Sequence, residues 1–181
     1  YVSVNQNFSG MGVGFIFNNE IYRGNRNAAG EMKSFLADGR LDTLIREARE
    51  VCRPDCFLKN HDLTDKLMLS DVIEQARRSD PAGLYILRRV TEEIAHHLHV
   101  LIDLFDPGIV VIGGDICTAE ALIRPVLDDT LKRLRSASAD EEPRVVYSPF
   151  GTYAVAMGAS VLVYDTIFRN KNTVIELRTK K

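Results

Sequence analysis

A continuous apolar run from Ile109 to Gly114 constrains the fold of this chain more than any other segment. Its sequence is IVVIGG, and it follows DPG, which ends the long helix predicted over residues 81–105. A strand without alternating polar residues is typical of a parallel sheet that is covered on both faces. The helix before it repeats apolar residues at three- and four-residue steps, which gives one buried face. Together these two segments predict an α/β fold.

The other predicted strands surround this run in a regular order. Three strands come first, over residues 1–8, 13–17 and 20–22, because apolar residues alternate or cluster there. Two asparagines between the second and third strands are typical of a tight hairpin. A further strand is expected at 144–148, so the chain carries enough strands for a mixed sheet.

Helices fill the rest of the predicted order. A mostly helical insert spans about 42–80 and is broken near Pro54, with Ser70 as a candidate cap inside it. Asp80 then caps the long helix, and Pro81 occupies its first turn. Small residues make the final helix slim enough for close packing. We expect a mixed sheet with helices on both faces, two further helices over residues 119–134 and 152–168, and a polar tail at about 169–181.

Composition limits the classes of function. The chain has 181 residues, is 45% hydrophobic and carries a formal charge of −2, with both signs scattered along it. One domain is expected at this length. The chain has no cluster of basic residues such as a nucleic-acid-binding surface carries, so any contact with DNA is expected outside this chain. No apolar run reaches membrane-spanning length, and no signal peptide precedes Tyr1, so we expect a cytoplasmic piece of a longer protein.

The three cysteines, Cys52, Cys56 and Cys117, are expected to be free thiols in a cytoplasmic setting. Cys52, Cys56 and His61 could imitate a metal site, but a structural zinc site needs four ligands around a tetrahedron. We therefore favour buried or incidental thiols. The histidines of the long helix, at positions 96, 97 and 99, are expected at a surface or an interface.

Glycines at three alternate positions, Gly10, Gly12 and Gly14, form the first candidate site. They leave backbone N–H groups unshielded, so the turn could approach a phosphate closely. The alternative is a hairpin that needs positive φ angles. The pattern does not stand alone, because it is followed in order by IYRG, AAGE, DPGIVVIGG and SPFGTYAVAMGAS.

This ordered set resembles the ROK family of sugar kinases and sugar-responsive repressors. The resemblance implies an actin-like, RNase H-like fold of two lobes, and it covers residues 9–164. It matches the C-terminal lobe alone, so residues 1–181 are expected to be a single lobe of that kind. The N-terminal lobe and any DNA-binding segment would lie outside the chain.

The resemblance also implies site residues. Ser9, Gly10 and Gly12 match the second phosphate-binding turn, and Gly113 and Gly114 match two glycines of a motif near the nucleotide.

Glu31, preceded by Gly30, matches the sugar-binding glutamate of the family's Glu-x-Gly-His motif. A carboxylate suits that role because it accepts charge-assisted hydrogen bonds from two adjacent sugar hydroxyls.

Departures from the family pattern change what is expected of this chain. Lys33 and Ser34 stand where the family has Gly and His, and the family's cysteine-rich zinc segment is absent. We therefore expect no zinc, and a sugar site in which Ser34 supplies only a hydroxyl. Asp115 replaces the third glycine of the nucleotide motif, and its charge argues against ATP and Mg²⁺.

Three functions remain open. The family's catalytic Asp and first phosphate loop belong to the N-terminal lobe, so we expect no phosphoryl transfer by this chain. We predict the effector-sensing and dimerisation lobe of a ROK-type transcriptional regulator, which binds a sugar or sugar phosphate and forms a homodimer. The alternatives are the C-terminal lobe of a divergent ATP-dependent sugar kinase, and a degenerate lobe kept for assembly.

Overall fold

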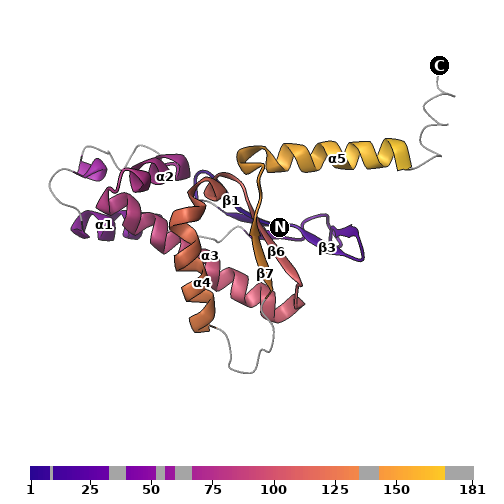
Figure 1. Ribbon diagram of the computed structural model, residues 1–181, viewed down its shortest axis with the longest axis horizontal. Helices are drawn as coiled ribbons and strands as arrows, with labels where there is room; N and C mark the ends of the chain where they lie inside the picture. The colour runs from indigo at the N-terminus through magenta and orange to yellow at the C-terminus, as the bar shows by residue number, and fades with distance from the viewer. Residues whose placement is uncertain (9, 33–39, 52–55, 60–66, 135–142, 170–181) are drawn as a thin grey trace, which may run out of the picture.

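The computed structural model describes residues 1–8, 10–32, 40–51, 56–59, 67–134 and 143–169, and the side chains of residues 165, 166 and 169 are outside the description (Figure 1). Its centre is a five-stranded sheet with the order β5-β2-β1-β6-β7. β2 is antiparallel to both β1 and β5, whereas β6 is parallel to both β1 and β7. The mixed α/β sheet predicted from the sequence is therefore confirmed. Its strands, in chain order, are β1 Val2–Val4, β2 Met11–Val13, β5 Glu31–Met32, β6 Ile109–Gly113 and β7 Arg144–Tyr147.

A separate two-stranded hairpin joins β2 to β5. It consists of β3 (Phe15–Phe17) and β4 (Glu20–Tyr22). Asn18 and Asn19 between them have φ angles of 53° and 65°, as a tight hairpin turn requires. The predicted Asn-Asn hairpin is thus confirmed.

Five α-helices and three short 3₁₀ helices complete the described residues. They are α1 Arg40–Val51, η1 Phe57–Lys59, α2 Leu69–Arg77, α3 Pro81–Phe105, η2 Asp115–Ala119, α4 Glu120–Leu134, η3 Gly151–Tyr153 and α5 Ala154–Arg169. No helix within these described ranges is long and apolar enough to cross a membrane.

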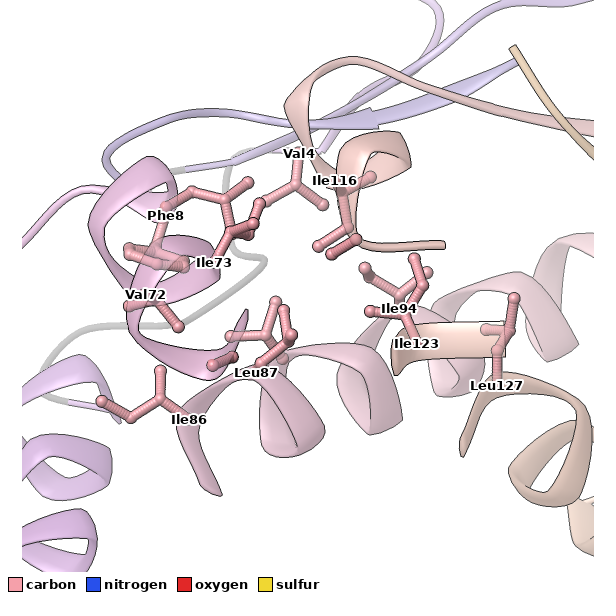
Figure 2. Close-up of a cluster of buried hydrophobic side chains, with 14 of the residues drawn as sticks. Val4, Phe8, Val72, Ile73, Ile86, Leu87, Ile94, Ile116, Ile123 and Leu127 are labelled. Carbon is pink, nitrogen blue, oxygen red and sulfur yellow. The ribbon is translucent and has the colours of Figure 1, made fainter. Parts of the chain in front are cut away.

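The core lies between the sheet and α3, α4 and η2. Figure 2 shows Val4 and Ile116 facing Ile94 of α3 and Ile123 of α4 across this layer. α1 and α2 pack against the N-terminal half of α3 and extend the same core. The helices that bury the apolar side chains of the sheet therefore lie on one of its faces. α5 packs against η3 and extends away from the sheet (Figure 1).

The first half of the sheet differs from the prediction in its boundaries. The strand expected over residues 1–8 ends at Val4, because the chain turns and Phe8 takes a left-handed φ of 58°. The strand expected over residues 13–17 divides at Gly14, which separates β2 from β3. β5 was not expected, because two residues are too short for a periodic pattern.

The helix caps show which predictions depend on local sequence. Asp80 caps α3 as expected, because its Oδ1 accepts from the N–H groups of Ala82 and Gly83 at 2.9 and 3.0 Å. Ser70 does not cap α2, so that prediction is wrong. The helix begins at Leu69, whose N–H donates to the backbone oxygen of Gln6 at 2.7 Å.

The side-chain oxygen of Gln6 also accepts from the Ser70 N–H at 3.2 Å. The β1–β2 turn therefore satisfies the first N–H groups of α2, from more than sixty residues away in the chain. Asp71 adds a local partner, because its carboxylate accepts from the Met68 N–H at 3.2 Å.

The prediction of free cysteines holds for Cys117 and is wrong for Cys56, which is disulfide-bonded. Its partner lies outside the described residues, as do Cys52 and His61. The count of cysteines carries no information about which thiols meet in the fold, so sequence reasoning had no signal for this bond.

The Asp80 cap gives a direct test of the fold. Asp80→Ala removes the acceptor for two helix N–H groups and for the Phe57 N–H, which donates to Oδ2 at 3.1 Å. We expect the free energy of unfolding to fall by about 1–2 kcal/mol in urea denaturation. Asp129→Ala, which removes only an exposed pair with Arg133, is the control and should change it by less than about 0.5 kcal/mol. Equal losses in the two variants would contradict this role for Asp80.

Candidate ligand-binding site

Four residues from four strands form one row across the sheet. The register pairs Glu31 with Gly12, Gly12 with Ser3, and Ser3 with Gly113. Paired residues in a sheet direct their side chains to the same face. This face is opposite to the one that α3 and α4 bury, because the neighbouring Val2 is in the core. We call these four residues the open-face row.

Gly12 has no structural reason to be glycine among the described residues. Its φ is not positive, and a Cβ added there would meet only the Ser3 Oγ, at 3.6 Å. Gly14 is similar, because an added Cβ would lie 3.8 Å from the Tyr1 Cβ. The alternative that these glycines serve a hairpin with positive φ is therefore wrong, since the positive φ of that turn belongs to Phe8.

Gly30 has a clear structural role. Its φ is 86°, and an added Cβ would lie 1.7 Å from the Val13 oxygen. Its own oxygen accepts from the Val13 N–H at 2.9 Å. This close approach joins the loop to β2 and places the next residue, Glu31, opposite Gly12. Glycine is required here by the chain itself, and a sugar contact at Gly30 stays a prediction.

Glu31 is exposed, and its carboxylate has no hydrogen-bond or salt-bridge partner within the described part of the chain. An exposed carboxylate is free to accept hydrogen bonds from a ligand. It lies on an edge strand beside Gly12, so a ligand above the row meets bare backbone next to a charge. Ser34 and Ser9, which the sequence also suggests, lie outside the described residues.

In the other glycine pair, Gly113 is covered by the chain itself. Gly113 is buried, and an added Cβ would lie 2.0 Å from the Tyr1 hydroxyl oxygen. Gly114 has a φ of 77°, which favours glycine at the start of η2. Gly10 is also buried, and its oxygen accepts from the Asn5 N–H at 3.0 Å. Gly113 therefore does not offer a ligand an open backbone surface in this conformation, and the absence of a bound nucleotide stays a prediction.

Two groups close to this pair have shifted pKa values. Asp115 is the first residue of η2, and burial raises the pKa of its carboxyl group. Burial also raises the pKa of the Cys117 thiol, whose Sγ donates to the Ile112 oxygen at 2.9 Å. A thiol held protonated in this way is a poor nucleophile at neutral pH.

Tyr147 of the edge strand β7 is paired with Ile112, so its side chain lies on the face of the sheet that α3 and α4 cover. Its ring lies beneath the Arg124 guanidinium, whose carbon is 4.5 Å from the ring centroid. Its hydroxyl is buried and has no hydrogen-bond partner among the described residues. Burial is the main cause that raises the pKa of this hydroxyl to about 12.

Metal ligands do not gather in the part of the chain that the structure describes. No group of three His, Cys, Asp or Glu side chains there could hold an ion. His99 Nε2 lies 3.5 Å from Asp103 Oδ2, and His97 Nδ1 lies 2.8 Å from the Glu93 backbone oxygen. Zinc therefore has no ligand set among these residues, and its absence from the protein stays a prediction.

Most of the chain matches a known protein family. The sequence model of the ROK family matches residues 6–166. The chain belongs to the ROK family. A curated relative, an uncharacterized protein of Clostridium perfringens, is 20% identical over 156 residues, which are 83% of this chain and 51% of that protein.

Solved structures of the ROK family share the fold. A glucokinase from Streptomyces griseus, in complex with glucose and AMPPNP, is 21% identical with a TM-score of 0.69; the match covers 89% of this chain and 58% of that one. A ROK transcriptional regulator, a homologue of the E. coli MLC protein, is 15% identical with a TM-score of 0.64. The match covers 89% of this chain and 44% of the regulator. The chain thus spans about half the length of the ROK proteins it matches, and both a kinase and a regulator share its fold.

Tyr1 is the residue at this site that sequence reasoning missed. The only signal was its position at the start of an alternating strand, two residues before Ser3 and on the same face. Tyr1 and Gly113 are more than a hundred residues apart in the chain, so no local sequence pattern predicts their contact.

The pKa of Tyr147 leads to a prediction about alkaline stability. An unfolded tyrosine loses its proton near pH 10, whereas the folded side chain holds it to about pH 12. The folded state therefore binds more protons in this window, and stability falls as pH rises through it. Tyr147→Phe should remove part of that loss, and should leave stability at pH 7 unchanged or higher by up to about 1 kcal/mol.

The measurement is urea denaturation at a series of pH values between neutrality and pH 11. Tyr153→Phe is the matched control, because Tyr153 is 74% exposed. If Tyr147→Phe loses stability as steeply with pH as the unmodified chain, the assignment of the alkaline loss to Tyr147 is wrong.

Proposed function

We propose that this ROK lobe senses a sugar and passes the signal to a DNA-binding segment outside the chain, as a part of a transcriptional regulator. The observation that supports this most is the pairing of Glu31 with Gly12. A carboxylate without a partner in the described part of the chain lies beside a residue that has no side chain, on a sheet face that the core helices leave open. Sugars present adjacent hydroxyl donors, which a single carboxylate accepts together.

The ligand class follows from this chemistry. A neutral sugar or a sugar phosphate donates hydroxyl hydrogens to Glu31 while its ring lies against Gly12. The glucose bound to the Streptomyces glucokinase of the same fold supports a sugar as the ligand of this lobe. The relation to a ROK regulator supports a sensing role.

A divergent sugar kinase is the second candidate function. The AMPPNP in the glucokinase structure favours it, because the same fold holds a nucleotide there. In this chain the Gly113 surface is covered by Tyr1, and Asp115 adds a carboxylate next to it. These two features favour sensing over phosphoryl transfer.

Glu31→Ala tests the sugar site. Removing a charged hydrogen-bond partner typically costs about 1.5–3 kcal/mol, so affinity for the sugar should fall about ten- to hundredfold. The measurement is calorimetric titration against a panel of hexoses, pentoses and N-acetylated sugars, with glucose first. Glu31 is exposed, so the variant should keep its unfolding free energy within about 0.5 kcal/mol.

Glu20→Ala is the matched control, because Glu20 is an exposed carboxylate on the neighbouring hairpin. It should bind the sugar as the unmodified chain does. Unchanged affinity in Glu31→Ala would contradict the site. Absence of binding to every sugar in the panel would favour the third function, a lobe kept only for assembly.

We further propose that the lobe forms a homodimer. α5 supports this because its apolar side chains are exposed all round the helix, whereas a helix of that composition is normally buried. Gly158 in its middle has no atom within 4 Å of an added Cβ. The exposed apolar residues of α5 are Val155, Met157, Val161, Leu162, Val163, Tyr164 and Phe168.

Val161→Asp tests this proposal, because Val161 is 60% exposed and a buried, unpaired carboxylate opposes association. We expect a dimer mass for the unmodified chain at micromolar concentration, by light scattering after gel filtration, and a monomer mass for the variant. Val51→Asp, at the end of α1 and 52% exposed, should remain a dimer. A monomeric mass for the unmodified chain would contradict the proposal.

A further inference from the structure

The position of the Tyr1 side chain is determined by the sheet rather than by the end of the chain. The backbone nitrogen of Tyr1 donates to the backbone oxygen of Gly14 at 2.9 Å. The Gly14 N–H donates to the backbone oxygen of Tyr1 at 2.8 Å. This pair extends the β1–β2 ladder by two residues beyond the pair of Ser3 and Gly12. Side chains two residues apart in a strand share a face, so Tyr1 lies on the same face as the open-face row.

The Tyr1 ring covers Gly113 on that face. A Cβ added to Gly113 would lie 2.0 Å from the Tyr1 hydroxyl oxygen, and 2.1 and 2.2 Å from two ring carbons. These contacts are far inside van der Waals distance, so a larger residue at position 113 would displace the ring. The hydroxyl oxygen is itself buried. Position 113 therefore requires glycine, because the Tyr1 side chain occupies the space that a Cβ would need.

A ligand that needs the Gly113 backbone must compete with this ring. A nucleotide base or ribose placed against the Gly113 Cα would overlap the ring atoms. Asp115, two residues further along the chain, adds a negative charge that disfavours an anionic ligand there. No other described glycine of the row has such a cover, because Gly12 meets only Ser3. The two ends of the row therefore differ: the Glu31 end is open and the Gly113 end is closed.

We propose that the Tyr1 side chain excludes adenine nucleotides from the Gly113–Gly114 surface, so that this lobe gains nucleotide affinity there when the ring is removed. The inference concerns the Gly113 end of the row alone, and it holds whether or not a sugar binds beside Glu31.

The test compares ADP binding by three forms of the chain, measured by calorimetric titration. Tyr1→Val removes the ring and keeps a strand-favouring residue, whereas Tyr1→Phe keeps the ring and removes only the hydroxyl. We expect no saturation below about 1 mM ADP for the unmodified chain and for Tyr1→Phe. Tyr1→Val should bind ADP at least about tenfold more tightly.

A double variant locates the gained site. Gly113→Ala in the Tyr1→Val background places a methyl group on the uncovered surface, and should remove the gained ADP affinity. Circular dichroism and thermal unfolding show whether each variant is folded.

Two results would overturn the proposal. One is equal ADP affinity in the unmodified chain and Tyr1→Val, and the other is a folded Tyr1→Val variant that does not bind ADP. If Tyr1→Val does not fold, the Gly113 amide signal of the unmodified chain decides instead, by nuclear magnetic resonance. The signal should stay constant as ADP is added, and a saturable shift would contradict the role of Tyr1.

Discussion

The approach of Gly30 to Val13 is the contact on which the candidate site depends. Gly30 reaches β2 closely only because it lacks a Cβ and adopts a φ of 86°. The hydrogen bond from the Val13 N–H to its oxygen then fixes the register of β5, a strand of two residues. A slip of one residue in that register would move Glu31 to the face that the helices bury. One backbone contact therefore decides whether the carboxylate faces a ligand or the core.

The sheet has two faces with different chemistry. Valines and isoleucines of β1 and β6 face α3 and α4, and this burial is the main source of stability for the lobe. The opposite face carries Glu31, two glycines and Ser3 in one row. Because the core of the lobe lies on the first face, the second face is free to carry polar and small residues. Under the proposed function, one small sheet would serve both stability and recognition.

The two ends of the row favour sensing over catalysis. At one end the Glu31 carboxylate has no partner among the described residues and Gly12 has no side chain, which suits a ligand with several hydroxyl donors. At the other end Tyr1 covers Gly113, where a nucleotide would need the backbone. A kinase requires both ligands together in one site. A sensor, the proposed function, requires only the sugar.

Features determined by neighbouring residues were predicted from the sequence. The Asp80 cap, the Asn18–Asn19 turn and the parallel strand at Ile109 all follow from short patterns, and the structure has all three. Features determined by distant residues were not. Gln6 caps α2, and Tyr1 covers Gly113, across separations of more than sixty and a hundred residues.

The family resemblance proposes residues for the site, and their binding role stays a prediction; it says nothing of how the chain holds them. It named Glu31, Gly30 and Gly113, whereas the reasons for glycine at positions 30 and 113 are contacts within the chain. β5 was missed because its two residues form a strand only when Gly30 joins them to β2.

Gly12→Val tests the central claim most directly, because it separates the ligand surface from the fold. The backbone of Gly12 suits any residue, an added Cβ would meet only the Ser3 Oγ at 3.6 Å, and valine favours strands. We expect the variant to keep the unfolding free energy of the unmodified chain and to lose at least about tenfold in sugar affinity by calorimetric titration. A stable Gly12→Val variant that binds the sugar as tightly as the unmodified chain would contradict the account of the open-face row.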